Sequence, residues 1–480
     1  MPLILPGNVA SALGGAYEVD NSCRFDDGSS ACMRQTFSGT ATAANKLTLS
    51  FWIKRSSFQL GTNTQAILNT ETGNLEEMIR FDEYDRLHIF TQNSAGAGTS
   101  SVKPSYQFKD PSAWYHIVVG IDTTQSTDTN RYKFWVNGSR LTVFTTTSYI
   151  SQNYTLRLNT AVEHEFGVRK GGAFLDAYIA ELVYIDGQQL DADQFGEYDD
   201  DSPRIWKPID ISGLTFGNNG FYCDFADSGD LGDDESGNGN DFTEAGLAAT
   251  DQTTDTPTNN FCVLNPLDNY YQSATFSEGN CKVVTAGSSN TAPTTATFGL
   301  TAGKWYWEAK FVSDSQGSSY AVIGIEGDQV TAALDALLEG ANVSYGLYLN
   351  DGKIWTNNSS NDHGAHVDLN SIIGVGLDLD NNRIYFSKDG NWGDGSGNWD
   401  ESTPNNFLAV TDPASVPLDA YFPAHGDWSS GTIGWEVNFG NPVHSISSGN
   451  SDANGYGNFE FSVPSGYLAL CTKNLGSNGG

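Results

Sequence analysis

Four tryptophans lie in two polar, glycine-rich stretches of the second half of the chain, and three of them, Trp392, Trp399 and Trp428, are surrounded by Gly, Asp and Asn. Residues 391–399 read NWGDGSGNW, and residues 424–435 read AHGDWSSGTIGW. Aromatic faces stack on sugar rings while nearby carboxylates and amides bond to hydroxyls, so this composition favours a carbohydrate site. The alternative is that each tryptophan only closes one end of a β-sandwich. The predicted ligand-binding residues are Trp392, Asp394, Trp399, Asp427 and Trp428.

A stretch dense in Asp, Asn and Gly, residues 221–242, allows two interpretations. These are the ordinary turn residues, so the stretch can be a run of solvated turns. Carboxylates on a flexible loop can also hold calcium, although their spacing here fits no defined ligand frame. We therefore expect no obligatory cofactor and keep calcium as the alternative. The candidate calcium ligands are Asp224, Asp227, Asp230, Asp233, Asp234 and Asp241.

A second calcium hypothesis concerns residues 371–390, SIIGVGLDLDNNRIYFSKDG. Asp378, Asp380 and Asn382 have the D-x-D-x-N spacing that opens a calcium loop. However, the sixth place of such a loop needs Gly and the twelfth needs Glu, and this chain has Arg and Asp there. Apolar residues alternate on both sides of the Asp-Asn-Asn break, which predicts a β-hairpin instead.

Catalytic patterns are sparse. A glycoside hydrolase needs two carboxylates roughly 5 to 10 Å apart, and the nearest candidate is the isolated run Glu163-His164-Glu165. The sequence has no G-x-S-x-G, H-E-x-x-H or Walker-type loop. We predict that the protein is not an enzyme. His116 lies on an alternating strand and is expected to be a partnered structural imidazole.

The elements around these residues resemble a known family. The order and spacing of GKWYWE (303–308), GLDLDNNRIYFSKDG (376–390), YFPA (421–424) and VNFG (437–440) resemble a SPRY (B30.2-like) domain. The resemblance covers about residues 265–475. It implies a bent β-sandwich of two antiparallel sheets, in a family whose members are binding modules.

The first half carries another set of alternating segments. LTLSFWIK (47–54), WYHIVVGID (114–122), YKFWVNG (132–138) and YIAELVYIDGQQL (178–190) together resemble the laminin-G-like (concanavalin-A-like) sandwich. Members of that family often hold calcium at one rim and bind sugars or proteins there. No ligand set in this sequence maps onto that site residue by residue.

Length and composition agree with a two-domain, all-β protein. The chain has 480 residues, 52 of them Gly, and the only helical pattern is at residues 329–338. We predict two antiparallel, jelly-roll-like β-sandwiches in tandem with an extended N-terminal arm. The predicted parts are an arm (1–24), a laminin-G-like sandwich (25–205), an Asp/Gly/Asn-rich junction (206–262), a SPRY-like sandwich (263–475) and a tail (476–480).

The opening MPLILPGNVASA, the segments DESGNGNDF (234–242) and TTDTPTNNFCVLN (253–265), and the ending PSGYLALCTKNL (464–475) resemble virion-associated proteins of tailed bacteriophages. The resemblance implies a virion structural and adhesion protein, a head-decorating or tail-fibre-type subunit whose lectin-like domains bind host surface glycan or protein. The alternatives are a purely architectural virion subunit and a glycan-cleaving enzyme.

Partners and location follow from charge and from the termini. A formal net charge of −34 argues against nucleic acid and anionic membrane surfaces as partners. No secretory signal and no membrane-spanning segment is evident, so we expect synthesis in the host cytoplasm, assembly into the virion and no membrane insertion. The apolar Leu3-Ile4-Leu5 predicts an arm that docks on other virion proteins, in a homo-oligomer. The six cysteines are expected to be thiols.

Overall fold

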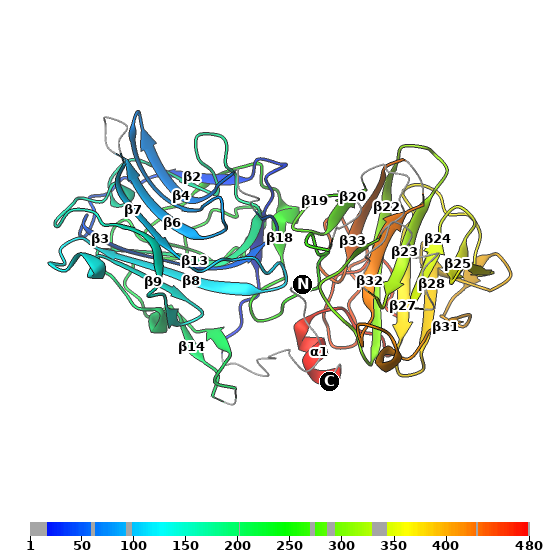
Figure 1. The fold of residues 1–480 in the computed structure, drawn as a ribbon. Helices are drawn as coiled ribbons and strands as arrows, with labels where there is room; N and C mark the ends of the chain where they lie inside the picture. The colour runs from blue at the N-terminus through cyan, green and yellow to red at the C-terminus, as the bar shows by residue number, and fades with distance from the viewer. Residues whose placement is uncertain are drawn as a thin grey trace. The chain divides into compact units, whose positions relative to one another are not determined.

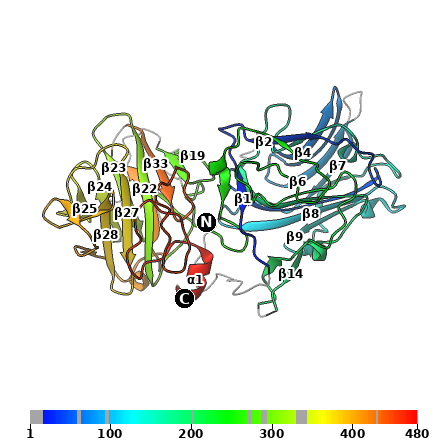
Figure 2. The same cartoon turned by 180° about the vertical axis from the view of Figure 1, so that it is seen from behind.

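The computed structural model describes residues 17–58, 63–92, 98–200, 202–268, 274–285, 293–328, 343–428 and 431–478. Within these ranges the chain is built from antiparallel strands, short 3-10 turns and one α-helix, α1 (Thr472–Asn478). The chain divides into two compact units, with the division between Thr258 and Asn259. Each unit is a β-sandwich, which confirms the predicted fold class (Figure 1, Figure 2).

The first unit contains two large sheets and one small pair of strands. The sheet that we call the β3 sheet has the order β10 (Ser139–Arg140), β9 (Tyr132–Val136), β8 (Trp114–Asp122), β3 (Lys46–Arg55), β13 (Ala177–Asp186), β1 (Ser22–Phe25) and β18 (Gln252–Thr253), with β16 (Phe221–Cys223) also on β13. The β5 sheet has the order β11 (Phe144–Ser148), β7 (Gly98–Pro104), β6 (Leu87–Gln92), β5 (Leu75–Phe81), β4 (Gln65–Thr72), β12 (Glu163–Phe166), β2 (Cys32–Thr36) and β17 (Thr243–Ala245). The small pair is β14 (Gly196–Tyr198) with β15 (Trp206–Pro208).

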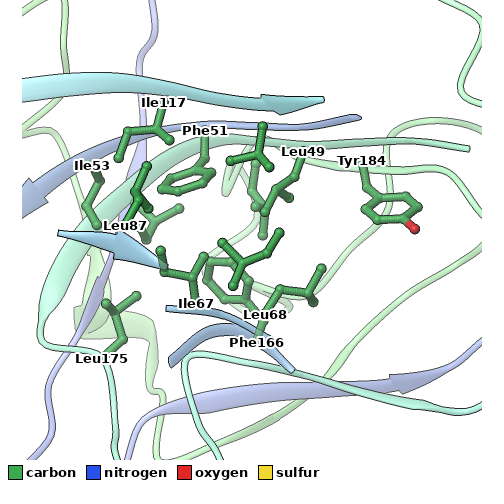
Figure 3. Packing of buried hydrophobic residues seen from close by; sticks show 14 of the residues in the cluster. Leu49, Phe51, Ile53, Ile67, Leu68, Leu87, Ile117, Phe166, Leu175 and Tyr184 are labelled. Carbon is green, nitrogen blue, oxygen red and sulfur yellow. The ribbon is translucent and has the colours of Figure 1, made fainter. Parts of the chain in front are cut away.

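Alternation along the strands explains the core of the first unit. Successive side chains of a strand point to opposite faces, so Leu49 and Phe51 of β3 both face inward. They meet Leu68 and Phe166, which come from the opposing β5 sheet (Figure 3). All four side chains are buried. The β3 strand was predicted from this alternation, and the structure confirms it.

Most of the segment predicted as a junction packs into the first unit. β16 pairs with β13, β17 with β2, and β18 with β1. The segment also contributes five side chains to the same hydrophobic core: Phe221, Cys223, Phe225, Leu231 and Phe242. Residues preceding β16, including Ile211 and Trp206, cover apolar side chains on the outer face of the β3 sheet. Residues 206–258 are therefore structural parts of the first sandwich.

The second unit also has two sheets. The β22 sheet has the order β19 (Thr275–Ser277), β20 (Lys282–Val284), β33 (Ile433–Asn438), β22 (Lys304–Asp314), β27 (Ile372–Asp378), β28 (Arg383–Lys388), β29 (Asn391–Gly393) and β30 (Trp399–Glu401), with β31 (Leu408–Ala409) on β28. The β23 sheet has the order β21 (Thr294–Thr295), β32 (Phe422–Asp427), β23 (Ala321–Glu326), β24 (Ser344–Tyr348), β25 (Lys353–Thr356) and β26 (Ser359–Asn361).

The predicted hairpin at residues 371–390 is confirmed as β27 and β28, which pair from Ile373–Lys388 to Asp378–Arg383. The Asp378 carboxylate accepts a hydrogen bond from Asn381 N at 3.0 Å and lies 3.0 Å from Lys304 Nζ. These contacts fix a turn and an ion pair, so the D-x-D-x-N spacing serves the hairpin.

Two predictions fall on residues that the structure does not describe. The arm predicted at 1–24 lies outside the described residues as far as residue 16, and the helix expected at 329–338 lies outside them entirely. The described end of the predicted arm includes part of β1, which pairs with β13 and therefore belongs to the first sandwich. Across the described ranges, no helix is long and apolar enough to cross a membrane. All six cysteines are buried and free, which confirms that they are thiols.

Candidate ligand-binding site

The structure places Trp392 in the interior and corrects the expectation that it lies at a loop tip. Trp392 belongs to β29, and only 5% of its surface is exposed. Its ring packs on the outer face of the β22 sheet with Tyr306, beneath Phe459 and Tyr467 of the C-terminal segment. Burial leaves almost no ring face for a sugar, so Trp392 is a structural residue of the sandwich.

Trp399 and Asp394 stabilise the loop that they share. Trp399 Nε1 donates to the Ala365 carbonyl at 2.8 Å, and its ring lies edge-on to His363 with centroids 5.5 Å apart. Asp394 accepts hydrogen bonds from Ser396 N at 2.6 Å and from Asn398 Nδ2 at 2.9 Å. These bonds, first the one from the Asn398 side chain, lower the pKa of Asp394. Each of these contacts holds the loop in shape without a ligand.

Asp427 and Trp428 stand at the end of β32, on the other sheet of the sandwich. Asp427 is buried, with 3% of its surface exposed, which keeps it from a ligand arriving from solvent. Trp428 is half-buried, and its backbone N–H donates to the Tyr320 carbonyl at 2.7 Å. The five predicted residues therefore do not form one site, because Trp392 and Trp428 lie on the outer faces of different sheets.

Trp428 instead belongs to a group of four aromatic side chains on the outer face of the β23 sheet. We call Tyr320, Tyr348, Trp355 and Trp428 the aromatic platform. Tyr320 and Tyr348 are stacked, with centroids 6.3 Å apart and planes 9° apart. Tyr348 meets Trp428 edge to face at 6.4 Å. Tyr320, Trp355 and Trp428 are half-buried, so each keeps part of its surface exposed.

The register of four strands explains why the aromatic side chains gather there. Tyr348 of β24 lies opposite Val322 of β23 on one side and opposite Lys353 of β25 on the other. The next row across the same face is Ala424, Gly324, Gly346 and Trp355. A Cβ at Gly324 would lie 1.9 Å from the Tyr345 carbonyl oxygen, so this position excludes any side chain. The large rings of the platform therefore lie beside the small residues Ala424, Gly324 and Gly346.

Charged side chains flank the platform at Trp355. Trp355 Nε1 donates to Asp351 Oδ2 at 3.1 Å, which fixes the indole orientation. Lys353 Nζ lies 2.8 Å from Asp362 Oδ1 in an exposed ion pair. Solvent screens an exposed pair of this kind, so it contributes little to stability, and both groups can exchange partners with a bound hydroxyl.

The platform has the chemistry of a weakly polar ring-binding surface. Sugar rings present C–H faces that pack on aromatic faces, and their hydroxyls bond to neighbouring carboxylates and amines. Sequence analysis singled out Trp428 as a ligand-binding candidate but not Tyr320, Tyr348 or Trp355. Strand alternation could have identified two of these rings. Tyr348 and Trp355 each follow a core residue, Leu347 and Ile354, so their side chains point to the outer face of the sheet.

The calcium candidates in residues 221–242 are hydrogen-bonded to their own loop. Asp234 accepts from the N–H groups of Tyr222 at 2.9 Å and Asn240 at 2.8 Å, and Asp224 and Asp227 each cap a turn. No group of three or more His, Cys, Asp or Glu side chains arranged to hold a metal occurs among the described residues. Asp230 and Asp233 are thus not brought into a ligand set with the other candidates.

The remaining candidates for chemistry have structural partners. Glu165 accepts from Arg34 Nε at 3.2 Å and from Asn69 Nδ2 at 3.0 Å, which occupies both carboxylate oxygens. His116 is buried between the rings of Trp52 and Trp206, and it bonds to Ser50 and Trp206, as expected for a structural imidazole. Burial lowers its pKa to about 3, so His116 is neutral at physiological pH.

Comparisons with known proteins identify the class of each unit. Residues 27–194 match the family model of the concanavalin A-like lectin/glucanases superfamily, and residues 304–396 match the model of the SPRY domain. The chain therefore carries a laminin-G-like (concanavalin A-like) domain followed by a SPRY domain, as predicted. None of the curated proteins compared with the chain matches it in sequence.

Several solved structures are similar to parts of the chain. The SPRY domain of human HERC1 is 15% identical, with a TM-score of 0.27, over 36% of this chain and 96% of the other. The SAP-like pentraxin of Limulus polyphemus is 18% identical, with a TM-score of 0.27, over 37% and 80%. A putative carbohydrate binding protein from Bacteroides ovatus is 13% identical, with a TM-score of 0.31, over 48% and 58%.

Proposed function

We propose that the protein is an adhesion subunit of a tailed-bacteriophage virion that binds host surface glycan through the aromatic platform of its SPRY domain. The observation that carries the binding site is the group of half-buried rings at Tyr320, Trp355 and Trp428 on one sheet face. Single exposed apolar residues are normal on a protein surface, whereas rings gathered beside charged groups mark an interaction site.

The virion part of the proposal is supported by sequence resemblance. The two ends of the chain and the segments 234–242 and 253–265 resemble virion-associated proteins of tailed bacteriophages. The subunit would be a head-decorating or tail-fibre-type protein that the N-terminal arm attaches to other virion proteins. A homo-oligomer would present several platforms at once, and multivalency raises the avidity of weak single sites.

The binding part is tested with the purified full-length chain on an array of bacterial surface glycans. The test variant is Trp428→Ala, which removes a platform ring at the end of β32. The matched control is Phe407→Ala, because Phe407 is 41% exposed and lies in the same unit but outside the platform. Loss of one stacked ring is expected to weaken binding at least about fivefold, by analogy with stacked bases.

The results separate the proposed function from its alternatives. Binding that Trp428→Ala weakens and Phe407→Ala preserves supports the platform. Equal binding by both variants places the glycan site elsewhere, and absence of binding across the array favours a purely architectural subunit. Release of shortened glycan during the same incubation would revive the glycan-cleaving alternative. A low-resolution map of the native particle tests the virion location independently.

A further inference from the structure

The outer face of the β5 sheet in the first unit is rich in cations, although the chain as a whole is strongly acidic. Its inner face packs the core, and the opposite side chains point outward from the sandwich. Six of the 24 Lys and Arg residues of the chain stand on this face or at its edge. They are Arg34, Arg80, Arg86, Lys103, Arg169 and Lys170.

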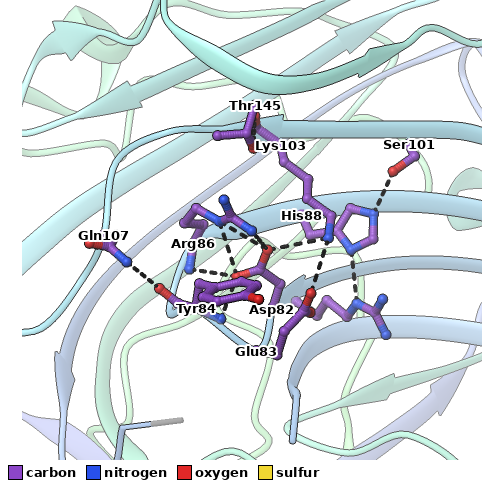
Figure 4. A network of polar contacts seen from close by, with 10 residues as sticks. Asp82, Glu83, Tyr84, Arg86, His88, Ser101, Lys103, Gln107 and Thr145 are labelled. Atoms are coloured by element: carbon purple, nitrogen blue, oxygen red, sulfur yellow. Dashed lines mark hydrogen bonds and ion pairs between the residues drawn. The ribbon is translucent and has the colours of Figure 1, made fainter. Parts of the chain in front are cut away.

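Five of these six cations are paired with carboxylates. Arg34 Nε lies 3.2 Å from Glu165, and Arg169 Nη2 lies 2.9 Å from Glu76. Lys170 pairs with Glu71. Arg86 and Lys103 share Asp82, with nitrogen–oxygen distances of 2.8 Å and 3.3 Å (Figure 4). Their charges are therefore balanced within the fold.

Arg80 differs from the other five. Among the described residues it makes no ion pair, and its guanidinium Nε donates to His88 Nδ1 at 3.0 Å. The guanidinium carbon lies 5.6 Å from the centroid of the Phe90 ring. His88 cannot balance the charge, because burial and then the charge of Arg80 lower its pKa to about 3 and keep it neutral. The carboxylates of Glu76, Glu83 and Asp82 act on the guanidinium only through space. Among the described residues its charge is therefore not held in a direct ion pair.

His88 also fixes the direction of the guanidinium. Because His88 Nδ1 accepts from Arg80, its Nε2 carries the proton and donates to Ser101 Oγ at 3.0 Å (Figure 4). This chain of bonds uses the Nε–H of Arg80 and leaves the two terminal amino groups for another acceptor. A planar fork with two open amino groups matches the two oxygens of a carboxylate.

The surroundings favour a carboxylate that belongs to a sugar. Phe90 is half-buried beside Arg80, and Tyr84, at the turn between β5 and β6, is 51% exposed. Tyr106 is 39% exposed, and the adjacent Gln107 donates to the Tyr84 carbonyl at 3.0 Å. The Tyr84 ring itself lies over Arg86, with the guanidinium carbon 4.7 Å from the ring centroid. A face with exposed rings and one arginine outside any direct ion pair suits an extended ligand that carries an isolated negative charge. A polyanion suits the face less well, because the net charge of −34 repels it at long range.

We propose that the outer face of the β5 sheet is a second glycan site, which binds an oligosaccharide with a single carboxylated sugar through the terminal amino groups of Arg80. Uronic acids and sialic acids both supply this planar carboxylate. The site lies in the first unit and does not depend on the aromatic platform of the second.

The experiment measures binding of the full-length protein to two acidic probes by isothermal titration calorimetry. One is sialyllactose, with lactose as its neutral partner, and the other is a glucuronate-containing disaccharide, with its methyl ester as partner. The wild type should bind at least one of the two acids. Its affinity for the matching neutral probe should be about tenfold or more weaker, because the neutral probe cannot form the charge-assisted hydrogen bonds. Which acid binds identifies the source of the carboxylate.

Substitutions then assign the contact to Arg80. Arg80→Gln should lose about tenfold in affinity for the acid, and Arg80→Lys should lose part of it, because lysine keeps the charge without the fork. Arg34→Gln is the control, since this arginine lies on the same face but is paired with Glu165. Binding of neither acid, equal binding of acid and neutral partner, or unchanged affinity in Arg80→Gln would overturn the proposal. If Arg80→Gln does not fold, Arg80→Lys and the wild-type comparison of acid and neutral probe decide.

Discussion

Replacing Trp392 by alanine should destabilise the SPRY domain rather than impair ligand binding directly. Only 5% of the Trp392 surface is exposed, and the ring is enclosed by Tyr306, Phe459 and Tyr467. Beneath it lies Gly376, where a Cβ would stand only 3.3 Å from the indole. A glycine cannot extend into the space that the ring leaves, so a cavity would persist.

The magnitude follows from that cavity. Truncation of a buried Trp to Ala costs about 3 to 5 kcal/mol, and poor collapse at Gly376 favours the upper half of this range. Urea unfolding of the full-length chain, followed by tryptophan fluorescence, should show one transition shifted down by roughly 1 to 2 M. The transition of the first unit should stay where it is, because no residue of that unit packs on Trp392 in its cluster of described residues.

Trp428→Ala is the matched comparison for this experiment. Trp428 is half-buried and its ring contacts Tyr348 edge to face, so its removal should cost roughly 1 to 2 kcal/mol or less. An unchanged urea midpoint in Trp392→Ala, together with lost glycan binding, would refute the reasoning. It would mean that Trp392 acts as a ligand-stacking group, as the sequence first suggested.

Three other perturbations test the pH response, the arm and the domain boundary. Burial raises the pKa of Glu181 to about 7, so the folded state holds a proton that the unfolded chain releases near its ordinary pKa of 4.5. The contribution of Glu181 to stability should therefore fall as the pH rises through this window, by up to roughly 3 kcal/mol. Glu181→Gln should remove this share of the fall in thermal unfolding measured from pH 4 to pH 8 and leave the share of Glu77, whose pKa is also raised to about 7. Deleting residues 1–6 should leave both domains folded, as judged by circular dichroism, and abolish incorporation into the particle; normal incorporation would exclude anchoring by the arm. A fragment of residues 17–258 should fold and unfold cooperatively. A fragment of residues 17–205 should not, because it lacks five side chains of the hydrophobic core. A cooperative transition in both fragments would contradict this boundary.

Periodicity and local motifs were sufficient to predict the two sandwiches. The hairpin of β27 and β28 has a strong alternating pattern, and its Asp-Asn-Asn break matches a turn in which Asn382 adopts a positive φ of 54°. The turn at Asn137-Gly138 likewise has a positive φ at both residues and joins β9 to β10. Such features are local, because neighbouring residues specify them.

Long-range packing decided the parts that the sequence did not predict. Trp392 resembles a loop residue because Gly, Asp and Asn surround it, yet Phe459 and Tyr467 cover it from more than sixty residues away. β16, β17 and β18 have two or three residues each, too few to show a period. The platform combines rings from β24, β25, the end of β32 and the loop before β23, so only strand register could bring them together.

The pairing of β1 with β18 has a consequence for synthesis. Ser22 lies opposite Thr253, and the Ser22 hydroxyl is 2.9 Å from the hydroxyl of Thr253. At roughly 5 to 20 residues per second, a ribosome needs on the order of 10 to 50 seconds to add the intervening chain. Throughout this interval β1 and β2 present unpaired edges to their surroundings, and edges of this kind recruit foreign strands. The edge of β2 closes only after β17 has been synthesised, and the edge of β1 only after β18.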